Sequence, residues 1–454
     1  MQEMQPPPRS QFTLLGQRRF GPFFFVQLLG AANDNLFNFA FTVLVAYGTF
    51  SAGLDPSLVI QLVAALFILP FVLLSATSGQ IADKFDKARL MRFVKTFELG
   101  IAALGLYGFM AGSVPVLLAG VFLLGVHSSL FGPVKYAYLP QHLGEHELTG
   151  GNGLEEMGTF VAILLGNVVG GWLVAVPGTG PVAVAWACML LAVLGRMAAQ
   201  FVPPSPPSDP LLRINWNAFT ETWRNLRLAS HDAIVFRALV GISWMWFFGV
   251  VFLTQFPSFA RDVLQGDEHV ASMLLVVFSI GIAIGALLCE SLSRKEVEIG
   301  LVPWGALGMT VFAVDLYLAS SSAMASPTLR SIGAFLQGVG SWRVMLDLFL
   351  LSMAAGIYSV PLYALVQWRS PPSHRSRIIA ANNILNALFM IVSSGMSAVL
   401  LGQGMWVPAL FAITAALNAV VTMAIFLSAP DYLRRAGALY RVKGGTTPPP
   451  LRRP

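Results

Sequence analysis

The sequence predicts an all-α integral membrane protein, with twelve transmembrane helices in two six-helix bundles related by pseudo-two-fold symmetry and with both termini in the cytoplasm. The first observation is composition: 56% of the residues are hydrophobic and only 11% are charged, whereas a soluble domain carries about a quarter charged residues. The second is a series of apolar runs about 20 residues long, the length of a membrane-spanning helix. The third is a similarity between the two halves of the chain.

Twelve apolar runs give the predicted spans. Backbone groups in lipid need hydrogen-bond partners within their own segment, so each run is expected to be helical. The runs cover residues 20–48, 57–80, 92–112, 114–134, 155–177, 181–202, 236–258, 270–290, 299–319, 344–366, 379–401 and 406–428. They divide the chain into an N-terminal bundle (1–202), a cytoplasmic linker (203–235), a C-terminal bundle (236–428) and a basic tail (429–454) that is expected to be disordered.

The two halves share one design. Residues 131–173 read as two apolar helices joined by a polar turn, and residues 357–400 repeat this arrangement, with Asn152 matched by Asn382. Membrane proteins built from such repeats commonly hold a solute between the repeated parts. The repeat therefore favours a transport function.

The charges in the loops predict the orientation. Most of the 28 Lys and Arg residues lie in segments on the same side as the N-terminus, and few lie in the opposite loops. Cytoplasmic loops are enriched in these residues, so both termini are expected to face the cytoplasm. The formal charge of +6 follows from this bias and does not indicate nucleic-acid binding.

The linker at 203–235 begins with a proline-rich stretch that cannot continue a helix. Further on, apolar residues recur at helical spacing, with arginines close to them in the sequence. The apolar residues are Trp216, Phe219, Trp223 and Leu226, and the arginines are Arg213, Arg224 and Arg227. This pattern predicts an amphipathic helix on the cytoplasmic membrane interface. A helix that only braces the two bundles is the alternative.

The loop between the second and third spans, GQIADKFDKARLMR, predicts a gating element. An acid at a helix end can pair with basic loop residues, or with the positive end of a neighbouring helix, and so stabilise one of two conformations. Here the chain resembles the major facilitator superfamily, whose loop motif has a glycine, an aspartate and several basic residues in this order. Ordinary decoration of a cytoplasmic loop is the alternative. The matching residues are Gly79, Asp83, Lys84, Lys87 and Arg89.

Polar residues inside the N-terminal spans predict a polar cavity. A carboxylate near the bilayer centre is costly unless it is paired, hydrated or protonated, so Asp34 in the first span is expected to face this cavity together with Asn35. A structural acid satisfied by Asn33 or Asn35 is the alternative. Lys95 and Glu98 stand three residues apart on one helical face, so they either pair with each other or line the cavity.

Three further positions are candidate substrate contacts. Glu155 and Glu156 begin the fifth predicted span, where acids either cap the helix or meet a substrate. Lys135 lies near the inner end of the fourth span, where it either extends to the interface or contacts a substrate. In the repeat, the uncharged Asn382 and Asn386 lie opposite the glutamates. Such an asymmetry suits a headgroup with charges of both signs.

Five segments carry a closer resemblance: GAANDNLFNFA, GQIADKFDKARLM, FGPVKYAYLP, NGLEEMGTFVAILLGNVVGGWL and VPLYALVQ. They resemble the bacterial lysophospholipid transporter family, which implies a flippase that moves lysophospholipids such as lysophosphatidylethanolamine across the inner membrane for reacylation by rocker-switch alternating access. The resemblance implies an acidic site residue at Asp34, a basic one at Lys135 and a second acid at Glu155. The family's arginine in the seventh span has no counterpart, because Thr254 and Gln255 occupy that region.

These inferences define the expected partners. They are a lysophospholipid, membrane lipid and a separate cytoplasmic acyltransferase or acyl-carrier-protein synthetase, with a monomeric chain and no nucleic acid. No cofactor or metal is expected, because Cys188 and Cys289 match no ligand spacing. A proton-coupled exporter of drugs or small metabolites, with Asp34 or Glu98 carrying the proton, is the second interpretation. An enzyme of lipid metabolism is the weakest, since the sequence lacks a nucleophile–base or phosphate-cradle spacing.

Overall fold

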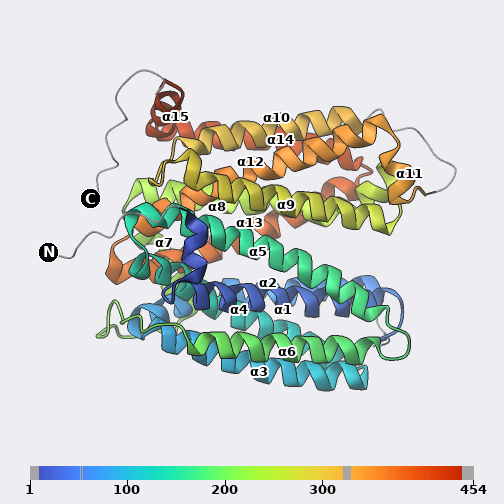
Figure 1. Ribbon diagram of the computed structural model, residues 1–454, viewed down its shortest axis with the longest axis horizontal. Coiled ribbons are helices and arrows are strands. Elements are labelled where there is room, and N and C mark those ends of the chain that lie inside the picture. The colour runs from blue at the N-terminus through green and yellow to red at the C-terminus, as the bar shows by residue number, and fades with distance from the viewer. Residues whose placement is uncertain (1–9, 52, 54, 321–328, 442–454) are drawn as a thin grey trace. The chain divides into compact units, whose positions relative to one another are not determined.

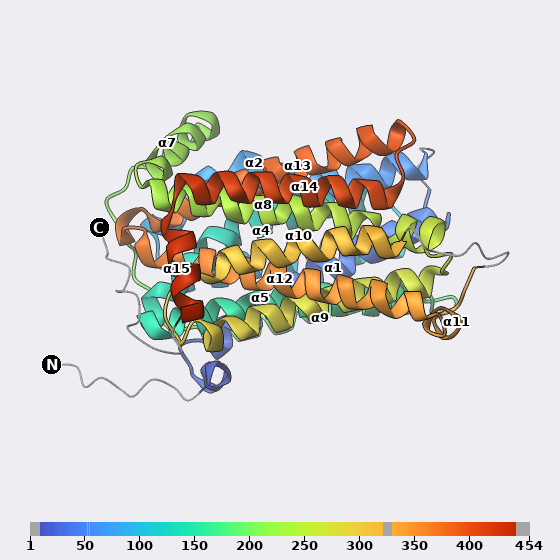
Figure 2. The same ribbon diagram turned by 90° about the horizontal axis from the view of Figure 1, so that it is seen from above.

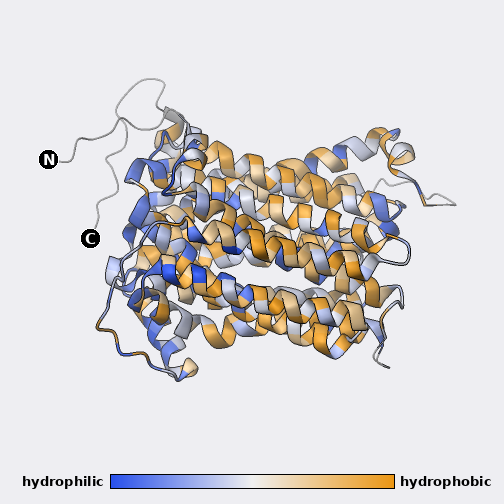
Figure 3. Ribbon diagram, turned by 60° about the horizontal axis from the view of Figure 1, so that its bottom comes forward, coloured by the Kyte–Doolittle hydropathy of each residue, from blue (hydrophilic) through white to orange (hydrophobic). Residues whose placement is uncertain are grey.

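The computed structural model describes residues 10–51, 53, 55–320 and 329–441 (Figure 1). Within these residues the chain is helical, and 12 helices are long and apolar enough to cross a membrane. The predicted number of spans is therefore confirmed. Figure 3 shows hydrophobic residues along most of the length of these helices, as expected for surfaces that face lipid.

The described residues of the first half of the chain form eight helices. They are η1 (Gln11–Gly16), α1 (Gly21–Ala46), α2 (Pro56–Lys84), α3 (Lys87–Ala111), α4 (Val114–His142), α5 (Glu145–Val174), α6 (Gly180–Gln200) and α7 (Ala218–Ser230). Side chains explain several of these boundaries. The carboxylates of Asp55 and Asp86 cap α2 and α3 by accepting hydrogen bonds from the N–H groups of Ser57 and Arg89. Helix α3 ends at Gly112, whose φ of 62° favours glycine.

The second half continues in the same manner. Its helices are α8 (Ala233–Ser258), η2 (Phe259–Val263), α9 (Glu268–Leu292), α10 (Leu301–Ser320), α11 (Ile332–Leu336), α12 (Val339–Arg369), η3 (Pro372–His374), α13 (Arg375–Gly402), α14 (Val407–Ser428) and α15 (Asp431–Arg441). Helix α15 lies in the segment that the sequence predicts to be a disordered tail. It packs Tyr432 against Phe426 at 5.7 Å between ring centroids, and Arg435 donates to Glu298 at 3.1 Å. Residues 442–454 lie outside the described part of the chain.

Helix α5 begins earlier than the apolar run indicates. The sequence predicts a polar turn before a span at 155–177, but α5 begins at Glu145. Hydropathy marks only the part of a helix that lies in lipid, and a helix can continue through polar residues beyond it. The N–H of Gly144 donates to the carboxylate of Glu147 at 2.9 Å, which caps this polar first turn.

The chain divides into two compact units, and both contain parts from each half. Unit 1 comprises Met1–Glu147, Gly158–His231 and Ser370–Ala387, and unit 2 comprises Leu148–Met157, Asp232–Arg369 and Leu388–Pro454. Unit 1 therefore includes the first part of α13, and unit 2 includes a short segment of α5.

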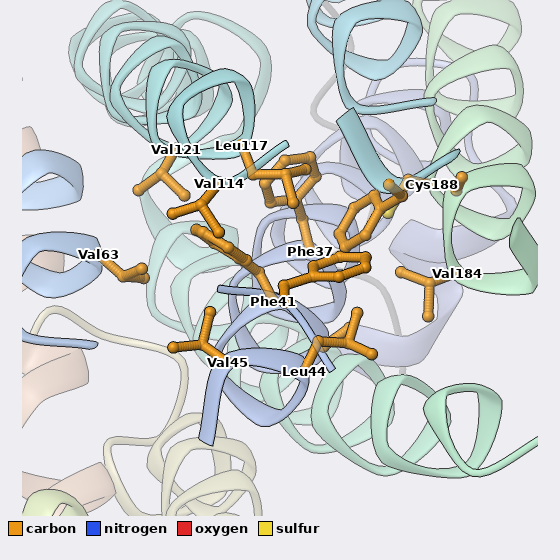
Figure 4. Packing of buried hydrophobic residues seen from close by; sticks show 14 of the residues in the cluster. Phe37, Phe41, Leu44, Val45, Val63, Val114, Leu117, Val121, Val184 and Cys188 are labelled. Carbon is orange, nitrogen blue, oxygen red and sulfur yellow. The ribbon is translucent and has the colours of Figure 1, made fainter. Parts of the chain in front are cut away.

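Unit 1 has an aromatic and aliphatic core around α1 (Figure 4). Phe37 lies at its centre and packs edge-on against Phe109 at 5.0 Å between ring centroids. A Cβ atom at Gly105 or Gly120 would approach the Phe37 ring to 2.5 or 2.9 Å, so glycine at both positions makes room for it. Cys188 is buried in this core, where it packs as a small apolar residue.

Unit 2 depends on close backbone contact between α9 and α12. A Cβ atom at Gly285 would lie 2.0 Å from the carbonyl oxygen of Met353, and one at Gly356 would lie 2.4 Å from that of Ile282. Small residues at helix interfaces permit this approach in membrane proteins, where dispersion contacts replace the hydrophobic effect. These glycines therefore fix the spacing of the two helices.

Candidate functional site

Six polar residues of α1, α3 and α4 meet inside unit 1 and form what we call the buried polar cluster: Asn33, Asp34, Lys95, Glu98, His127 and Ser128. Glu98 is the common partner. It accepts from Lys95 Nζ at 2.6 Å and from Asn33 Nδ2 at 2.9 Å, and His127 Nε2 lies 3.6 Å away. The side chains of Lys95 and Glu98 are fully buried, so the pairing expected from their spacing is present in the structure.

The surroundings of Lys95 compensate for part of the cost of burying it. Two charges removed from water need close geometry and further hydrogen bonds to recover their hydration energy. The ammonium group lies 5.7 Å from the ring centroid of Phe131, within range of a cation–π interaction. Glycine at position 30 leaves room for it, because a Cβ atom there would lie 2.3 Å from Lys95 Nζ. The cluster is thus built into the packing of the helices.

Asp34 is the member of the cluster with spare hydrogen-bonding capacity. Its Oδ2 accepts from Ser128 Oγ at 2.5 Å. Its Oδ1 is buried and has no hydrogen-bond partner within the described residues. Asn33 is engaged with Glu98, and Asn35 donates to the carbonyl of Ala31 on its own helix at 2.8 Å. The structure therefore does not show the satisfied structural acid that the sequence left open.

Asp83 lies in the last turn of α2, in the segment that the sequence predicts to be a gating loop, and it pairs with the first turn of α13. Arg377 Nε donates to its Oδ2 at 3.1 Å, and the backbone N–H of Ser376 donates to its Oδ1 at 3.1 Å. The first turn of a helix has unsatisfied N–H groups and a partial positive charge, both of which favour a carboxylate. Of the two partners expected for Asp83, the positive end of a helix is the one observed. Gly79 allows this approach, since a Cβ atom there would lie 2.7 Å from Ala380 Cβ.

The remaining gating residues have other contacts. Lys87 is buried and donates from Nζ to Ser208 Oγ in the linker at 3.1 Å. Lys84 lies 5.9 Å from the ring centroid of Phe85. Arg89 is exposed. Only part of the basic loop therefore serves a structural contact, and that contact is with the linker.

The other predicted site residues lie in both units. Lys135 belongs to unit 1 and lies 4.6 Å from the ring centroid of Tyr136. Asn382 and Asn386 also belong to unit 1, and Asn382 is buried. Glu155 and Glu156, both buried, belong to the α5 segment of unit 2. Of the predicted site residues, the structure thus brings Asp34, Lys95 and Glu98 into one cluster within unit 1.

Three polar pairs were not predicted from the sequence. Arg377 is one. In unit 2, Asn152 and Gln367 exchange amide hydrogen bonds of 3.0 and 2.7 Å while both are buried. In unit 1, Arg19 forms a bidentate pair with Glu147, with its shortest contact at 2.5 Å. The match between Asn152 and Asn382 in the repeat was the available signal for Asn152, but its partner 215 residues along the chain depends on tertiary packing.

In the seventh span, the two residues that occupy the region of the family's arginine have uncharged side chains that bond within their own helix. Thr254 Oγ1 donates to the carbonyl of Val250 at 2.8 Å, and Gln255 Nε2 donates to Thr254 Oγ1 at 3.3 Å. Both side chains are thus satisfied within their own helix. Within the described residues, no group of three or more His, Cys, Asp or Glu side chains could hold a metal ion.

The fold and the buried polar cluster together indicate the class of protein. Twelve candidate spans within the described residues, with ionisable groups buried inside three packed helices, are typical of multi-pass membrane transporters. A model of the Major Facilitator Superfamily matches residues 23–394, so the chain belongs to that superfamily. It is a transporter rather than an enzyme.

Curated relatives are similar over most of the chain. It is 27% identical to the lysophospholipid transporter LplT of Serratia proteamaculans over 377 residues, which cover 82% of this chain and 85% of the relative. It is 29% identical to the lysophospholipid transporter LplT of Escherichia coli O157:H7 over 383 residues, which cover 81% and 85%. The resemblance read from the five sequence segments is confirmed by these matches.

Solved structures share the fold at lower identity. The human organic anion transporter MFSD10 has a TM-score of 0.69 at 15% identity, covering 93% of this chain and 100% of that one. The proton:xylose symporter XylE, bound to 6-bromo-6-deoxy-D-glucose, has a TM-score of 0.68 at 14% identity, covering 90% and 95%. At these identities the likeness shows the fold alone.

Proposed function

We propose that this transporter moves lysophospholipids, such as lysophosphatidylethanolamine, across the bacterial inner membrane to the cytoplasmic leaflet, where a separate acyltransferase system reacylates them. The observation that carries the proposal is similarity to lysophospholipid transporters over more than four-fifths of the chain. Transport proceeds by rocker-switch alternating access between the repeated halves.

The chemistry of the polar residues supports such a cargo. A lysophospholipid presents a phosphate, often an ammonium group, and a single acyl chain. Asp34 Oδ1, which has no partner among the described residues, can accept from an ammonium. Lys135 supplies a cation for the phosphate, and Glu155 supplies a second acid. Asn382 and Asn386 are neutral hydrogen-bonding groups for the rest of the headgroup.

The contact between Asp83 and α13 supports a two-state mechanism. Two charge-assisted hydrogen bonds to a fully buried carboxylate stabilise whichever conformation contains them. Loss of both bonds in the other conformation would make Asp83 a latch between the two states. Gly79, Asp83 and Arg377 are therefore proposed as gating residues.

The second candidate is a proton-coupled exporter of small molecules. The observation that favours it is the buried polar cluster, because three titratable groups, Asp34, Glu98 and His127, lie close together inside lipid-embedded helices. Intramembrane ionisable residues of this kind form proton relays in other transporters.

Reconstitution distinguishes the two candidates. The purified protein in liposomes is given labelled lysophosphatidylethanolamine or lysophosphatidylglycerol, and movement between leaflets is followed with and without a pH gradient. We expect transport of both lipids. Asp34→Asn should lower the transport rate of lysophosphatidylethanolamine about tenfold or more, because a hydrogen bond to a charged group contributes roughly 1.5–3 kcal/mol. It should lower the rate of lysophosphatidylglycerol less.

Asp262→Asn is the matched control, because it removes one exposed carboxylate from η2. It should leave both rates unchanged. Equal rates for wild type and Asp34→Asn with the ethanolamine lipid would remove Asp34 from the headgroup site. Absence of lysolipid movement, together with uptake of a dye driven by the pH gradient, would favour the exporter.

A further inference from the structure

Helix α7 exposes aromatic side chains and buries two polar ones. Trp216, just before the helix, and Phe219 and Trp223 within it are 74%, 81% and 71% exposed. Glu221 and Asn225, on the other side, are fully buried. A helix that packs on a protein surface normally does the opposite. The exposed aromatic side chains of α7 therefore require an apolar environment other than the protein.

Hydrogen bonds fix this inverted orientation. Helix α7 lies beside α2 (Figure 2). Asn225 Nδ2 donates to the carbonyl of Ala76 at 3.4 Å, and Gln80 forms two bonds with the backbone of Asn215, of 2.7 and 3.0 Å. Ala76 lies eight residues before the end of α2, about 12 Å along the helix axis. These contacts hold α7 beside the last turns of a candidate membrane span.

A basic pocket opens beside α7 within unit 1. Its volume is about 150 Å³, roughly ten times the space that one water needs. Three arginines, two histidines and one asparagine supply its polar lining, and none of its described lining residues is a carboxylate. The lining residues are Arg224, Asn225, Arg227, Leu228, His231, His374 and Arg377.

The surrounding acids leave positive charge in this pocket. Arg377 pairs with Asp83 at 3.1 Å and with Asp209 at 3.3 Å. Arg224 lies 3.9 Å from Glu221, a weak contact, and its side chain is 63% exposed. Within the described residues, the guanidinium of Arg227 has no ion pair. The pocket can therefore accept an anion with forked donors of the kind that bind phosphate.

We propose that this pocket binds the phosphate of an anionic membrane phospholipid, while Trp216, Phe219 and Trp223 insert among the neighbouring lipids. The membrane is the source of the phosphate, because the same helix carries both the arginines and exposed aromatic residues, the two components of an interfacial lipid contact. Arg377 belongs to both the pocket and the Asp83 contact, so a bound lipid also bears on the gating residues. The proposal does not depend on the identity of the transported solute.

Direct lipid binding tests the proposal. The full-length protein is placed in nanodiscs of phosphatidylcholine containing a small fraction of brominated phosphatidylglycerol or brominated phosphatidylcholine. Bromine quenches nearby tryptophan fluorescence, and the difference between wild type and Trp223→Phe isolates the signal of Trp223. We expect brominated phosphatidylglycerol to quench Trp223 more strongly than brominated phosphatidylcholine does. Replacing Arg224 and Arg227 together by Gln should lower the apparent affinity for phosphatidylglycerol about 30-fold, since each basic residue near a membrane surface contributes about fivefold.

Matched variants give the controls. Arg213→Gln removes an exposed arginine from the same linker outside the pocket. The fold-change in affinity for phosphatidylglycerol should be less than half that of the double Gln variant. Replacing Arg224 and Arg227 by Lys retains the charges and should restore most of the binding, which separates charge loss from misfolding. Equal losses for Arg213→Gln and the double Gln variant, or no preference for phosphatidylglycerol, would overturn the proposal.

Soluble inorganic phosphate, titrated at constant ionic strength, distinguishes the two sources of the anion. Because it lacks acyl chains, it should displace the lipid only weakly. Phosphate binding that persists when Trp216 and Phe219 are replaced by Ser, and that displaces phosphatidylglycerol completely, would refute a lipid ligand. This binding assay uses a diacyl lipid and involves no transport, so its outcome is separate from that of the lysophospholipid experiment.

Discussion

Glu98→Gln should be among the most destabilising conservative substitutions in this protein. The change keeps the size of the side chain but leaves the ammonium of Lys95 fully buried with no carboxylate beside it. Glu98 also accepts from Asn33 at 2.9 Å and lies 3.6 Å from His127, so its removal affects two further polar groups. Breaking a buried ion pair by removing one partner costs about 3–5 kcal/mol. We therefore expect a loss of this size.

A double-mutant cycle tests the cause. Lys95→Met alone should destabilise by a similar amount, because it leaves the Glu98 carboxylate buried without its cation. The combination of Lys95→Met with Glu98→Leu should recover most of the loss, because an apolar pair of similar volume removes both charges from the interior. The free energy of unfolding is measured by denaturant titration of the detergent-solubilised protein.

Two results would refute this reasoning. A loss below about 1 kcal/mol for Glu98→Gln would mean that water reaches Lys95 and hydrates it, since surface ion pairs contribute only about 0–1 kcal/mol. Strict additivity in the double variant would mean that the two charges do not interact in the folded state. Transport assays on the double variant then show whether the charges serve function as well as structure.

Two further predictions concern the other polar contacts. Gly79→Ala places a Cβ atom 2.7 Å from Ala380 Cβ and 2.9 Å from the carbonyl oxygen of Ser376. This crowding should destabilise the contact between α2 and α13 by about 1–3 kcal/mol. The expected readout is faster chemical labelling of a cysteine introduced at the start of α13. Gly100→Ala, where a Cβ atom meets nothing within 4 Å, is the control, and an equal effect there would contradict the packing argument. Asn152→Ala leaves the buried amide of Gln367 without its partner and should cost about 1–3 kcal/mol in denaturant unfolding. A neutral result would show that water replaces the lost bond.

The sequence was sufficient to predict the spans because their signal is local. Length and apolarity define a membrane helix within one window of residues, and all twelve appear within the described residues. The start of α5 at Glu145 was missed because its first turns are polar, and α15 was missed because its apolar face is narrow. Both errors lie where a helix leaves the apolar region and hydropathy carries no information.

The candidate site was predictable only where its contacts are local in sequence. Lys95 and Glu98 pair as their three-residue spacing indicates. The contact of Asn33 with Glu98 and that of Arg377 with Asp83 join residues 65 and 294 positions apart. One sequence cannot identify Asn33 as the partner of Glu98 or Arg377 as the partner of Asp83. Many polar residues could form these bonds, and only the packing of the helices decides which of them come close. For α7, the pattern predicted amphipathicity, but only the structure shows that the aromatic face is the exposed one.

The two units stabilise polar groups at the middle of their helices by different chemistry. Unit 1 uses charges, with Lys95 and Glu98 fully buried. Unit 2 also buries Glu155 and Glu156, but three of its other helices use a neutral network, in which Trp244 donates to Asn418 at 2.8 Å and Asn418 donates to Thr310 at 2.8 Å. Losing one partner costs about 1–3 kcal/mol in a neutral network, compared with about 3–5 kcal/mol for a buried ion pair. A change of protonation can therefore act strongly on the middle of unit 1, while the Trp244–Asn418–Thr310 network of unit 2 has no titratable group through which to respond.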